Sequence, residues 1–224
     1  MKKIQVPCGF SEEARQAYKF AWDIAIANEG ELVVLHVVDL ALFFDSSTYA
    51  QPYYVDSGAT PADLTEGTKK DFNELIQDYP QGVPLQLLVE QWELHQTIVK
   101  TIEELNSDLI VMGTKGAASL RELRIGSNTE KIVRNAPVPV FTVHQAMPVS
   151  KIKDIVFPAK LDLTQRRLIA KLKTLQTFFG ATVRLHFIRS SDVTTIDNET
   201  TMATDNFAKF YQLDKLQNSC SSDP

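Results

Sequence analysis

The sequence predicts an α/β fold: a five-stranded parallel, doubly wound sheet, followed by a partial second copy of the same unit. Short apolar runs rich in β-branched residues alternate with stretches of helical period, which is typical of strands joined by crossover helices. The runs are apolar at consecutive positions, as in strands that are buried on both faces of a parallel sheet. The start of this pattern recurs near residue 154, which indicates a second copy.

Four helices are expected between the five strands. The first begins after Ser11, whose side chain can cap free N–H groups, and two glutamates follow at the positive end of the helix dipole. The fourth ends before Pro137, because a residue that precedes proline is disfavoured in helical geometry. The predicted helices begin near residues 12 and 63 and cover about 93–105 and 127–135; the predicted strands are 4–6, 32–38, 85–89, 109–112 and 138–143.

Residues 39–60 are too long and too mixed in composition for an ordinary loop between a strand and a helix. Their aromatic side chains follow neither a helical nor a strand period, and we predict a lid or a partner-facing insertion here. The aromatic residues are Phe43, Phe44, Tyr49, Tyr53 and Tyr54.

The chain is expected to form a first domain over residues 1–145 and an incomplete second domain over residues 151–224. The second domain has two predicted strands, 154–158 and 182–188, and two helices, of which the last covers about 198–216. Strands three to five and the glycine-rich segment have no second copy. Because two strands and two helices cannot bury both faces of a sheet, this half must pack on the first domain, pair with another chain or be partly disordered.

Two short matches relate the copies. The second strand of each copy contains a Leu-His pair, so His36 and His186 are predicted to be packed residues at equivalent strand positions. Gly30 and Gly180 are expected to mark the same exit from the preceding helix.

The composition is that of a globular chain, with 44% hydrophobic residues and a formal net charge of -5. A negative average field repels nucleic acid, so no nucleic-acid partner is expected. No apolar run approaches the roughly 20 residues that cross a bilayer, and no secretory leader is recognised, so we expect a cytoplasmic protein without membrane contact. Cys8 and Cys220 lack the spacing of disulfides or metal ligands, and no metal site is predicted.

A glycine-rich segment joins the fourth predicted strand to the fourth predicted helix. Gly113 and Gly116 follow the strand, and Gly126 with Ser127 opens the helix after nine intervening residues. Glycine lets backbone amides approach phosphate oxygens closely, and a helix N-terminus adds unpaired donors and positive partial charge. The segment therefore predicts a phosphate site at the edge where open α/β sheets bind ligands. The alternative is that the glycines only turn the chain and Ser127 only caps the helix.

This segment resembles the Gly-x2-Gly-x9-Gly-Ser signature of ATP-binding universal stress proteins. The helix and strand that follow it, the opening at residues 6–14 and the strand at 35–38 are also similar to that family, and the repeat resembles its tandem members. The resemblance covers residues 1–145 and implies a nucleotide-binding α/β sandwich that holds ATP or a related adenine nucleotide, with or without Mg²⁺. The nucleotide-binding residues that it implies are Pro7, Cys8, Gly9, Val38, Met112, Gly113, Gly116, Arg124, Gly126, Ser127 and Asn128.

The resemblance also implies a division of roles. The glycines and Ser127 would hold the phosphates, and Val38 with the end of the first strand would line the adenosine pocket. One position departs from the pattern, because the family commonly has an aspartate contacting the nucleoside where this chain has Gly9, and the second copy has Lys160 there. Loss of one hydrogen-bonded carboxylate typically weakens binding by about 1–3 kcal/mol, or roughly one to two powers of ten in affinity.

The glycine-rich segment also contains Lys115, Arg121 and Arg124. One or two of them would fold over a triphosphate, or all three would be exposed charges of a solvated loop. No Gly-x4-Gly-Lys-Ser/Thr loop is present, and no base is recognised beside the segment. No catalytic residue is therefore predicted, and any ATP hydrolysis is expected to be slow.

Residues 138–143 are predicted to form an edge strand, because Pro139 cannot donate to a central ladder. In the resembling family this strand pairs with its counterpart, so a homodimer through residues 138–143 is expected. The leading hypothesis is a stress-response protein whose nucleotide occupancy changes dimer or partner contacts. The alternatives are an interaction module of the same fold that has lost nucleotide binding and acts through residues 39–60 and the second copy, or a slow ATPase.

Overall fold

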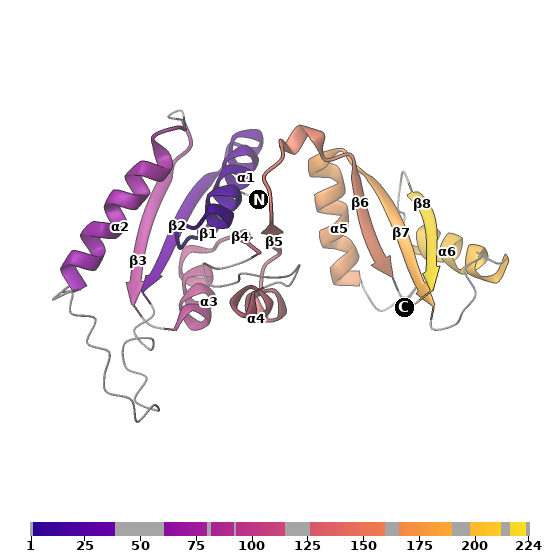
Figure 1. The fold of residues 1–224 in the computed structure, drawn as a ribbon. Helices are drawn as coiled ribbons and strands as arrows, with labels where there is room; N and C mark the ends of the chain where they lie inside the picture. The colour runs from indigo at the N-terminus through magenta and orange to yellow at the C-terminus, as the bar shows by residue number, and fades with distance from the viewer. Residues whose placement is uncertain are drawn as a thin grey trace, which may run out of the picture. The chain divides into compact units, whose positions relative to one another are not determined.

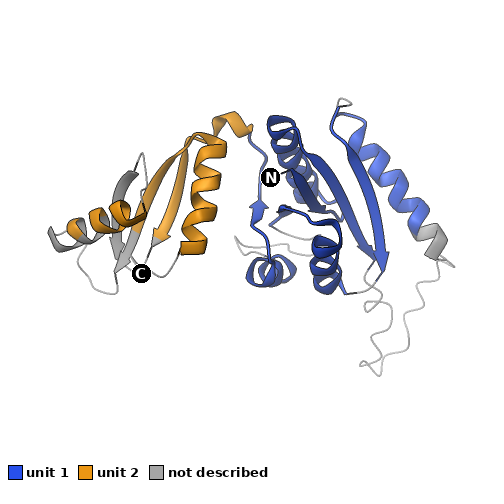
Figure 2. Cartoon of the chain, turned by 180° about the vertical axis from the view of Figure 1, so that it is seen from behind, with its two compact units in different colours: residues 1–147 blue, residues 148–224 orange. Residues whose placement is uncertain are grey.

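The computed structural model describes residues 2–38, 61–79, 82–91, 93–114, 126–159, 166–189, 198–211 and 216–222. Within it the chain divides into two compact units, Met1–Met147 and Pro148–Pro224, shown in different colours in Figure 2. Each unit has its own sheet and is described by itself below. The predicted insertion at residues 39–60 lies outside the described residues.

The first unit is a parallel five-stranded sheet in the order β3-β2-β1-β4-β5, which confirms the predicted doubly wound α/β fold (Figure 1). The chain moves from β1 outward to β3 and then returns to β4 on the other side of β1. Right-handed crossovers therefore place α1 and α2 on one face and α3 and α4 on the other. The elements are β1 Lys3–Pro7, α1 Glu12–Asn28, β2 Glu31–Val38, α2 Pro61–Ile76, β3 Leu85–Gln91, α3 Leu94–Leu105, β4 Leu109–Gly113, α4 Ser127–Asn135 and β5 Val140–Val143.

Alternate residues of the central strands pack into two separate layers. One apolar cluster joins β2 and β4 to α3 and α4, and it contains Leu35, Ile98, Ile102, Ile110, Met112 and Ile132. The intervening strand residues, such as Val34 and Val111, are also fully buried and face the side of α1. Burial on both faces explains why these strands read as continuous apolar runs.

The ends of α1 follow from local chemistry. Ser11 accepts a hydrogen bond from the Ala14 backbone N–H at 3.3 Å, as the sequence predicts for an N-cap. At the other end Glu29 adopts the left-handed conformation, with φ 48°. Gly30 follows it, and a Cβ there would lie 2.6 Å from the carbonyl oxygen of Lys2. Gly30 is therefore required by the close approach of β1 rather than by a left-handed turn.

The second unit contains a parallel three-stranded sheet in the order β6-β7-β8. The sequence predicted two strands here and a last helix that reached residue 216. Instead, the helix ends at Tyr211 and a third strand pairs with β7. Its sequence is polar and has no apolar alternation, so the pairing with β7 overrides local preference. The elements are the short 3-10 helix Val149–Lys151, β6 Asp154–Ala159, α5 Arg166–Phe179, β7 Thr182–Arg189, α6 Asn198–Tyr211 and β8 Leu216–Ser222.

The strand register corrects the predicted match between the two Leu-His pairs. Pro7 of β1 pairs with Leu35, whereas the corresponding Pro158 of β6 pairs with His186. His186 is therefore equivalent to Leu35 and not to His36. A shift by one residue moves a side chain to the opposite face of a sheet, so the two histidines have different environments.

The predicted match between the helix-exit glycines is shifted in the same way. Glu31 pairs with Lys3 and Thr182 pairs with Asp154, which makes Gly180 the equivalent of Glu29. Gly180 has φ 60°, so in both units the chain leaves the helix through a left-handed residue.

The second unit has a small core of its own on one face of its sheet. Phe157 and Leu185 pack with residues of α5 and α6 in a single apolar cluster. The next residues along these strands differ, because Val156 is exposed and Arg184 is only half-buried. The described residues thus show a core on one face of this sheet, which is not among the three outcomes that the sequence predicts for this half.

Candidate functional site

The carboxyl ends of β1 and β4 lie side by side at the centre of the sheet. The chain leaves β1 toward β2 and leaves β4 toward β5, so the order of strands reverses between them (Figure 1). Open α/β sheets bind ligands in the crevice outside such a reversal point. Of the predicted site residues, Pro7, Cys8 and Gly9 lie at the end of β1, and Met112 and Gly113 lie at the end of β4.

The end of β1 is tightly packed up to Cys8 and open at Gly9. The Cys8 backbone N–H donates to the Leu35 carbonyl oxygen at 2.9 Å, and only 4% of the residue is exposed. Burial raises the pKa of the Cys8 thiol to about 11, so the thiol is neutral at physiological pH. Gly9 is exposed, and a Cβ added there would meet no atom of the described residues within 4 Å. A side chain at position 9 would therefore fit without steric conflict with the part of the chain that the structure describes.

Phe10, which follows the end of β1, and His36 of β2 pack against each other at this edge of the sheet. Phe10 has a left-handed backbone, with φ 57°, and its ring stacks on His36 with 5.2 Å between ring centres. The His36 ring nitrogen Nδ1 lies 2.9 Å from the carbonyl oxygen of Cys8, which can only accept, so Nδ1 carries the hydrogen. His36 is thus packed and hydrogen-bonded, as the sequence predicts. The left-handed Phe10 has no signal in the sequence, because glycine or asparagine is usual in that conformation.

The first turn of α4 is fixed against the end of β4. The Thr129 hydroxyl donates to the Gly113 carbonyl oxygen at 3.1 Å, and the Gly126 N–H donates to the Thr114 carbonyl oxygen at 2.8 Å. Gly126 is the N-cap residue and supplies no side-chain cap. The first-turn N–H groups of α4 therefore receive no side-chain acceptor from the cap position, and they carry the positive end of the helix dipole.

Ser127 lies beside Asn128 in this first turn, and both residues are exposed. The hydroxyl oxygen of Thr114 is buried at the end of β4 and has no hydrogen-bond partner among the described residues. The result is a group of donors at the carboxyl edge that suits an anion. Sequence reasoning missed Thr114, which lies between the first two glycines of the segment, and Thr129, which lies two residues after Ser127.

Gly113 has a role in packing. A Cβ at this position would lie 2.9 Å from the backbone carbon and oxygen of Glu13, so α1 could not approach β4 as closely. This contact supports the alternative in which Gly113 serves the chain's own packing, and it leaves α4 and the β1 end as the features that point to a ligand.

The remaining predicted residues are only partly placed. Val38 is half-buried at the end of β2, the strand next to β1. Gly116 and Arg124 lie outside the described residues, together with Lys115 and Arg121. In the described ranges, no three His, Cys, Asp or Glu side chains are grouped to hold a metal ion. None of the described helices combines the length and apolar character needed to cross a bilayer.

These features define the class of protein: a doubly wound α/β domain with an uncapped helix N-terminus at its strand-order reversal. The model of the universal stress protein family matches residues 1–144, and the chain belongs to that family.

Individual relatives agree with this assignment. The universal stress protein MJ0531 of Methanocaldococcus jannaschii is 29% identical over 155 residues, which cover 63% of this chain and 81% of the relative. The solved structure of MJ0577, from the same organism, is 27% identical with a TM-score of 0.53 and covers 65% of this chain and 97% of its own.

One solved structure extends over both units. A universal stress protein from Archaeoglobus fulgidus covers 99% of this chain and 79% of its own, with a TM-score of 0.66. Its sequence identity is 16%, so this likeness concerns the fold alone.

Proposed function

We propose that the chain binds ATP or a related adenine nucleotide at the carboxyl edge between β1 and β4, and that nucleotide occupancy changes its contacts with a second copy or a partner. The observation that carries this proposal is the first turn of α4, which is held against β4 by Thr129 and Gly126 without a side-chain cap. Such a turn presents backbone N–H groups, without a side-chain cap from Gly126, at the edge where open α/β sheets take anionic ligands.

The phosphates would lie against α4. Ser127 and Asn128 would donate from the first turn, with Gly126 allowing close approach of the backbone. A negatively charged chain needs such local donors, since its formal net charge is -5. Mg²⁺, when bound together with the nucleotide, would supply positive charge that offsets the charge of the phosphates. No base is assigned to this edge, and rapid hydrolysis is not part of the proposal.

The nucleoside would lie over the ends of β1 and β2. The buried Pro7 and Cys8 and the half-buried Val38 supply apolar surface there, and Gly9 leaves open space beside them. The proposal places the protein in the cytoplasm, where a free thiol such as that of Cys8 persists in its reduced form.

The dimer would form through β5, an edge strand of the five-stranded sheet. The carbonyl oxygens of Pro139 and Val143 accept hydrogen bonds from β4. Because backbone groups alternate in direction along a strand, those of Val140 and Thr142 face the open edge. Unpaired groups in a row form a template for another strand.

We further propose that the second unit is an incomplete copy of the first. Its order β6-β7-β8 repeats β1-β2-β3, with α5 and α6 at the positions of α1 and α2. The copy then extends as far as the third strand, one strand more than the sequence predicts.

The alternative function is an interaction module without nucleotide. Two observations favour it: Gly9 replaces the carboxylate expected from the family resemblance, and Gly113 has a packing role. Native mass spectrometry of the purified protein, with titration calorimetry against ATP and Mg²⁺, distinguishes the two. Retained or saturable adenine nucleotide supports the proposal, and absence of binding at millimolar ATP leaves the interaction module.

A further inference from the structure

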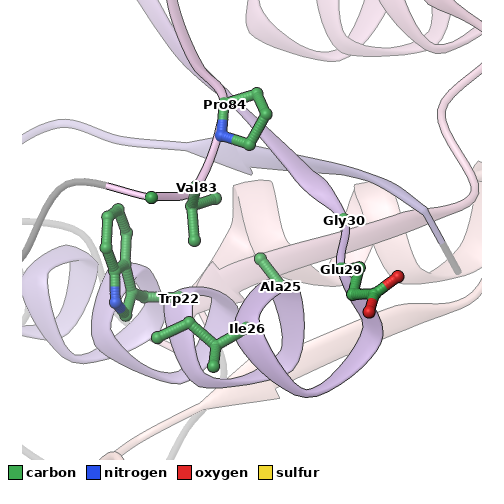
Figure 3. A pocket seen from close by; sticks show the side chains of 8 residues that line it. Trp22, Ala25, Ile26, Glu29, Gly30, Val83 and Pro84 are labelled. Carbon is green, nitrogen blue, oxygen red and sulfur yellow. The ribbon is translucent and has the colours of Figure 1, made fainter.

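A second candidate site lies at the opposite end of the first unit's sheet. A pocket of about 350 Å³ opens between the last turns of α1 and the segment 82–84 that enters β3 (Figure 3). It adjoins the amino ends of β2 and β3, whereas the proposed nucleotide edge is formed by the carboxyl ends of β1 and β4 in the same parallel sheet. The two sites are therefore separate.

The pocket walls are apolar and held in place. Trp22 and Ile26 project from α1 toward Val83 and Pro84 across the opening (Figure 3). The Trp22 ring packs against Tyr79 with 5.3 Å between ring centres. The Pro84 carbonyl oxygen accepts from the Leu32 N–H at 2.9 Å, which fixes the opposite wall to β2. Pockets of roughly 300 Å³ and above with apolar walls are typical of small-molecule sites.

Ile26 is a large apolar side chain that remains 54% exposed at this rim. Isolated exposed apolar residues are common and need no explanation. Here, however, the exposed isoleucine continues a surface already formed by Trp22, Val83 and Pro84 (Figure 3). A ligand with an apolar body would cover Ile26, Val83 and Pro84 together and would meet only the exposed edge of Trp22, which is 6% exposed.

The electrostatics of the pocket favour a cation. Among the described residues that line the pocket, Glu29 is the only one with a charged side chain, and this side chain is 94% exposed. The last turn of α1 has no basic residue, so the negative end of its dipole lies at the same place. Lys2 already lies at this helix end, with its Nζ 2.7 Å from the Asn28 carbonyl oxygen and 3.9 Å from Glu29 Oε2, so a ligand ammonium would share Glu29 with Lys2.

We propose that this pocket binds a small organic cation with a flat apolar body, of the aryl-alkylamine class. The ring would pack between Trp22 and Pro84, and the ammonium group would face the Glu29 carboxylate. A neutral ligand of the same shape would lose the charge contact, and a carboxylate would be repelled. A peptide or an anionic ligand is an outcome that the test below would reveal.

Amide chemical shifts of the full chain, measured by NMR during titration, test the proposal directly. The probes are 2-phenylethylamine, the neutral 2-phenylethanol and the anionic 3-phenylpropionate. The amine should cause saturable shifts at the amides of Gly30 and Gly82, and the alcohol should bind roughly two- to fivefold more weakly, as expected for an exposed charge pair. The anion should bind more weakly than the alcohol.

Two substitutions locate the interaction. Glu29→Gln should reduce amine affinity to that of the alcohol without changing alcohol binding, while Glu103→Gln, a matched loss of charge at the exposed end of α3, should change neither. Ile26→Ala should weaken the amine and the alcohol by a similar factor. Saturating ATP should leave the titration unchanged, because the nucleotide edge is at the other end of the strands.

The proposal is overturned if none of the three probes causes saturable shifts at these amides. It is also overturned if the anion binds as tightly as the amine, if Glu29→Gln has no effect, or if ATP displaces the amine. Because Glu29 and Ile26 are both exposed, we expect the variants to fold, and far-UV circular dichroism checks this. If these results overturn the pocket proposal, the nucleotide proposal is not affected.

Discussion

The hydroxyl of Thr129 in α4 donates a hydrogen bond to the carbonyl oxygen of Gly113 at the end of β4, across 3.1 Å. Thr129 is 3% exposed, so this bond lies inside the protein although its neighbours Ser127 and Asn128 are exposed. A side chain of the first helical turn thus sets the position of the helix N-terminus relative to the sheet. The direction of the proposed phosphate donors depends on this contact.

Thr129→Val replaces the hydroxyl with a methyl group of similar size. The variant should lose about 1–2 kcal/mol of unfolding free energy, because the buried bond is lost. It should also bind ATP several-fold more weakly, since α4 is no longer held by its first turn. Denaturant titration and calorimetry measure the two effects, and Thr129→Ser should retain both properties. Equal ATP affinity in the wild type and Thr129→Val would separate this bond from ligand binding.

Gly9→Asp should strengthen nucleotide binding. Gly9 is exposed and a Cβ there meets no described atom within 4 Å, so the carboxylate can be added without displacing any residue that the structure describes. If it contacts the nucleoside as the family resemblance implies, the binding free energy should become more favourable by about 1–3 kcal/mol, which lowers Kd roughly 5- to 150-fold. Gly9→Ala serves as the control and should leave Kd unchanged. An unchanged Kd in Gly9→Asp would argue against a nucleoside at this strand end.

Thr142→Pro should prevent the proposed dimer. The Thr142 backbone faces the open edge of β5, so proline removes a donor from the dimer edge without breaking a bond to β4. Light scattering should show a dimer for the wild type and for Thr142→Val, and a monomer for Thr142→Pro. A wild-type monomer, or a dimer that persists in Thr142→Pro, would rule out pairing through this strand.

The buried Cys8 thiol predicts a loss of stability at alkaline pH. Burial raises the pKa of Cys8 from 9.0 to about 11, so between these values the unfolded chain loses the thiol proton while the folded chain keeps it. Stability from this residue is complete below pH 9 and should decline by about 1.4 kcal/mol per pH unit above it, on the order of 2–3 kcal/mol in total.

Denaturant titrations of the wild type and Cys8→Ala between pH 8 and 11 check this prediction. Burial also raises the pKa of Tyr18 and Tyr79, which lowers alkaline stability in both proteins. The difference between the two curves therefore isolates Cys8. Parallel curves would show that Cys8 ionises in the folded state as readily as in the unfolded state.

The first unit could be read from the sequence because its local signals agree with its tertiary structure. Glycine before Ser127 and proline after Ala136 bound α4 at the residues that the sequence predicts. In the second unit, β8 depends on pairing with β7 and has no apolar pattern of its own. The match between the two Leu-His pairs predicted the wrong equivalence of the histidines, because identical residues in two strands do not determine strand register.

In the candidate site, too, some features can be predicted from the local sequence and others depend on tertiary structure. The glycine spacing indicates which residues surround the end of β4, but it does not reveal why each is there. Gly113 is explained by the approach of Glu13 from α1, which only the packed helix shows. The hydroxyl contact of Thr129 and the left-handed Phe10 likewise depend on tertiary geometry.

The most direct test of the central claim is the affinity of Ser127→Asp for ATP. An aspartate in the first turn of α4 suits the helix dipole and should leave stability unchanged or raise it by about 0.3–1 kcal/mol. The same charge would repel a phosphate, so ATP affinity should fall at least about tenfold by calorimetry. Asn135→Asp, the same charge change at the far end of α4, should bind ATP as the wild type does. Equal affinity in Ser127→Asp and the wild type would contradict phosphate binding at this helix.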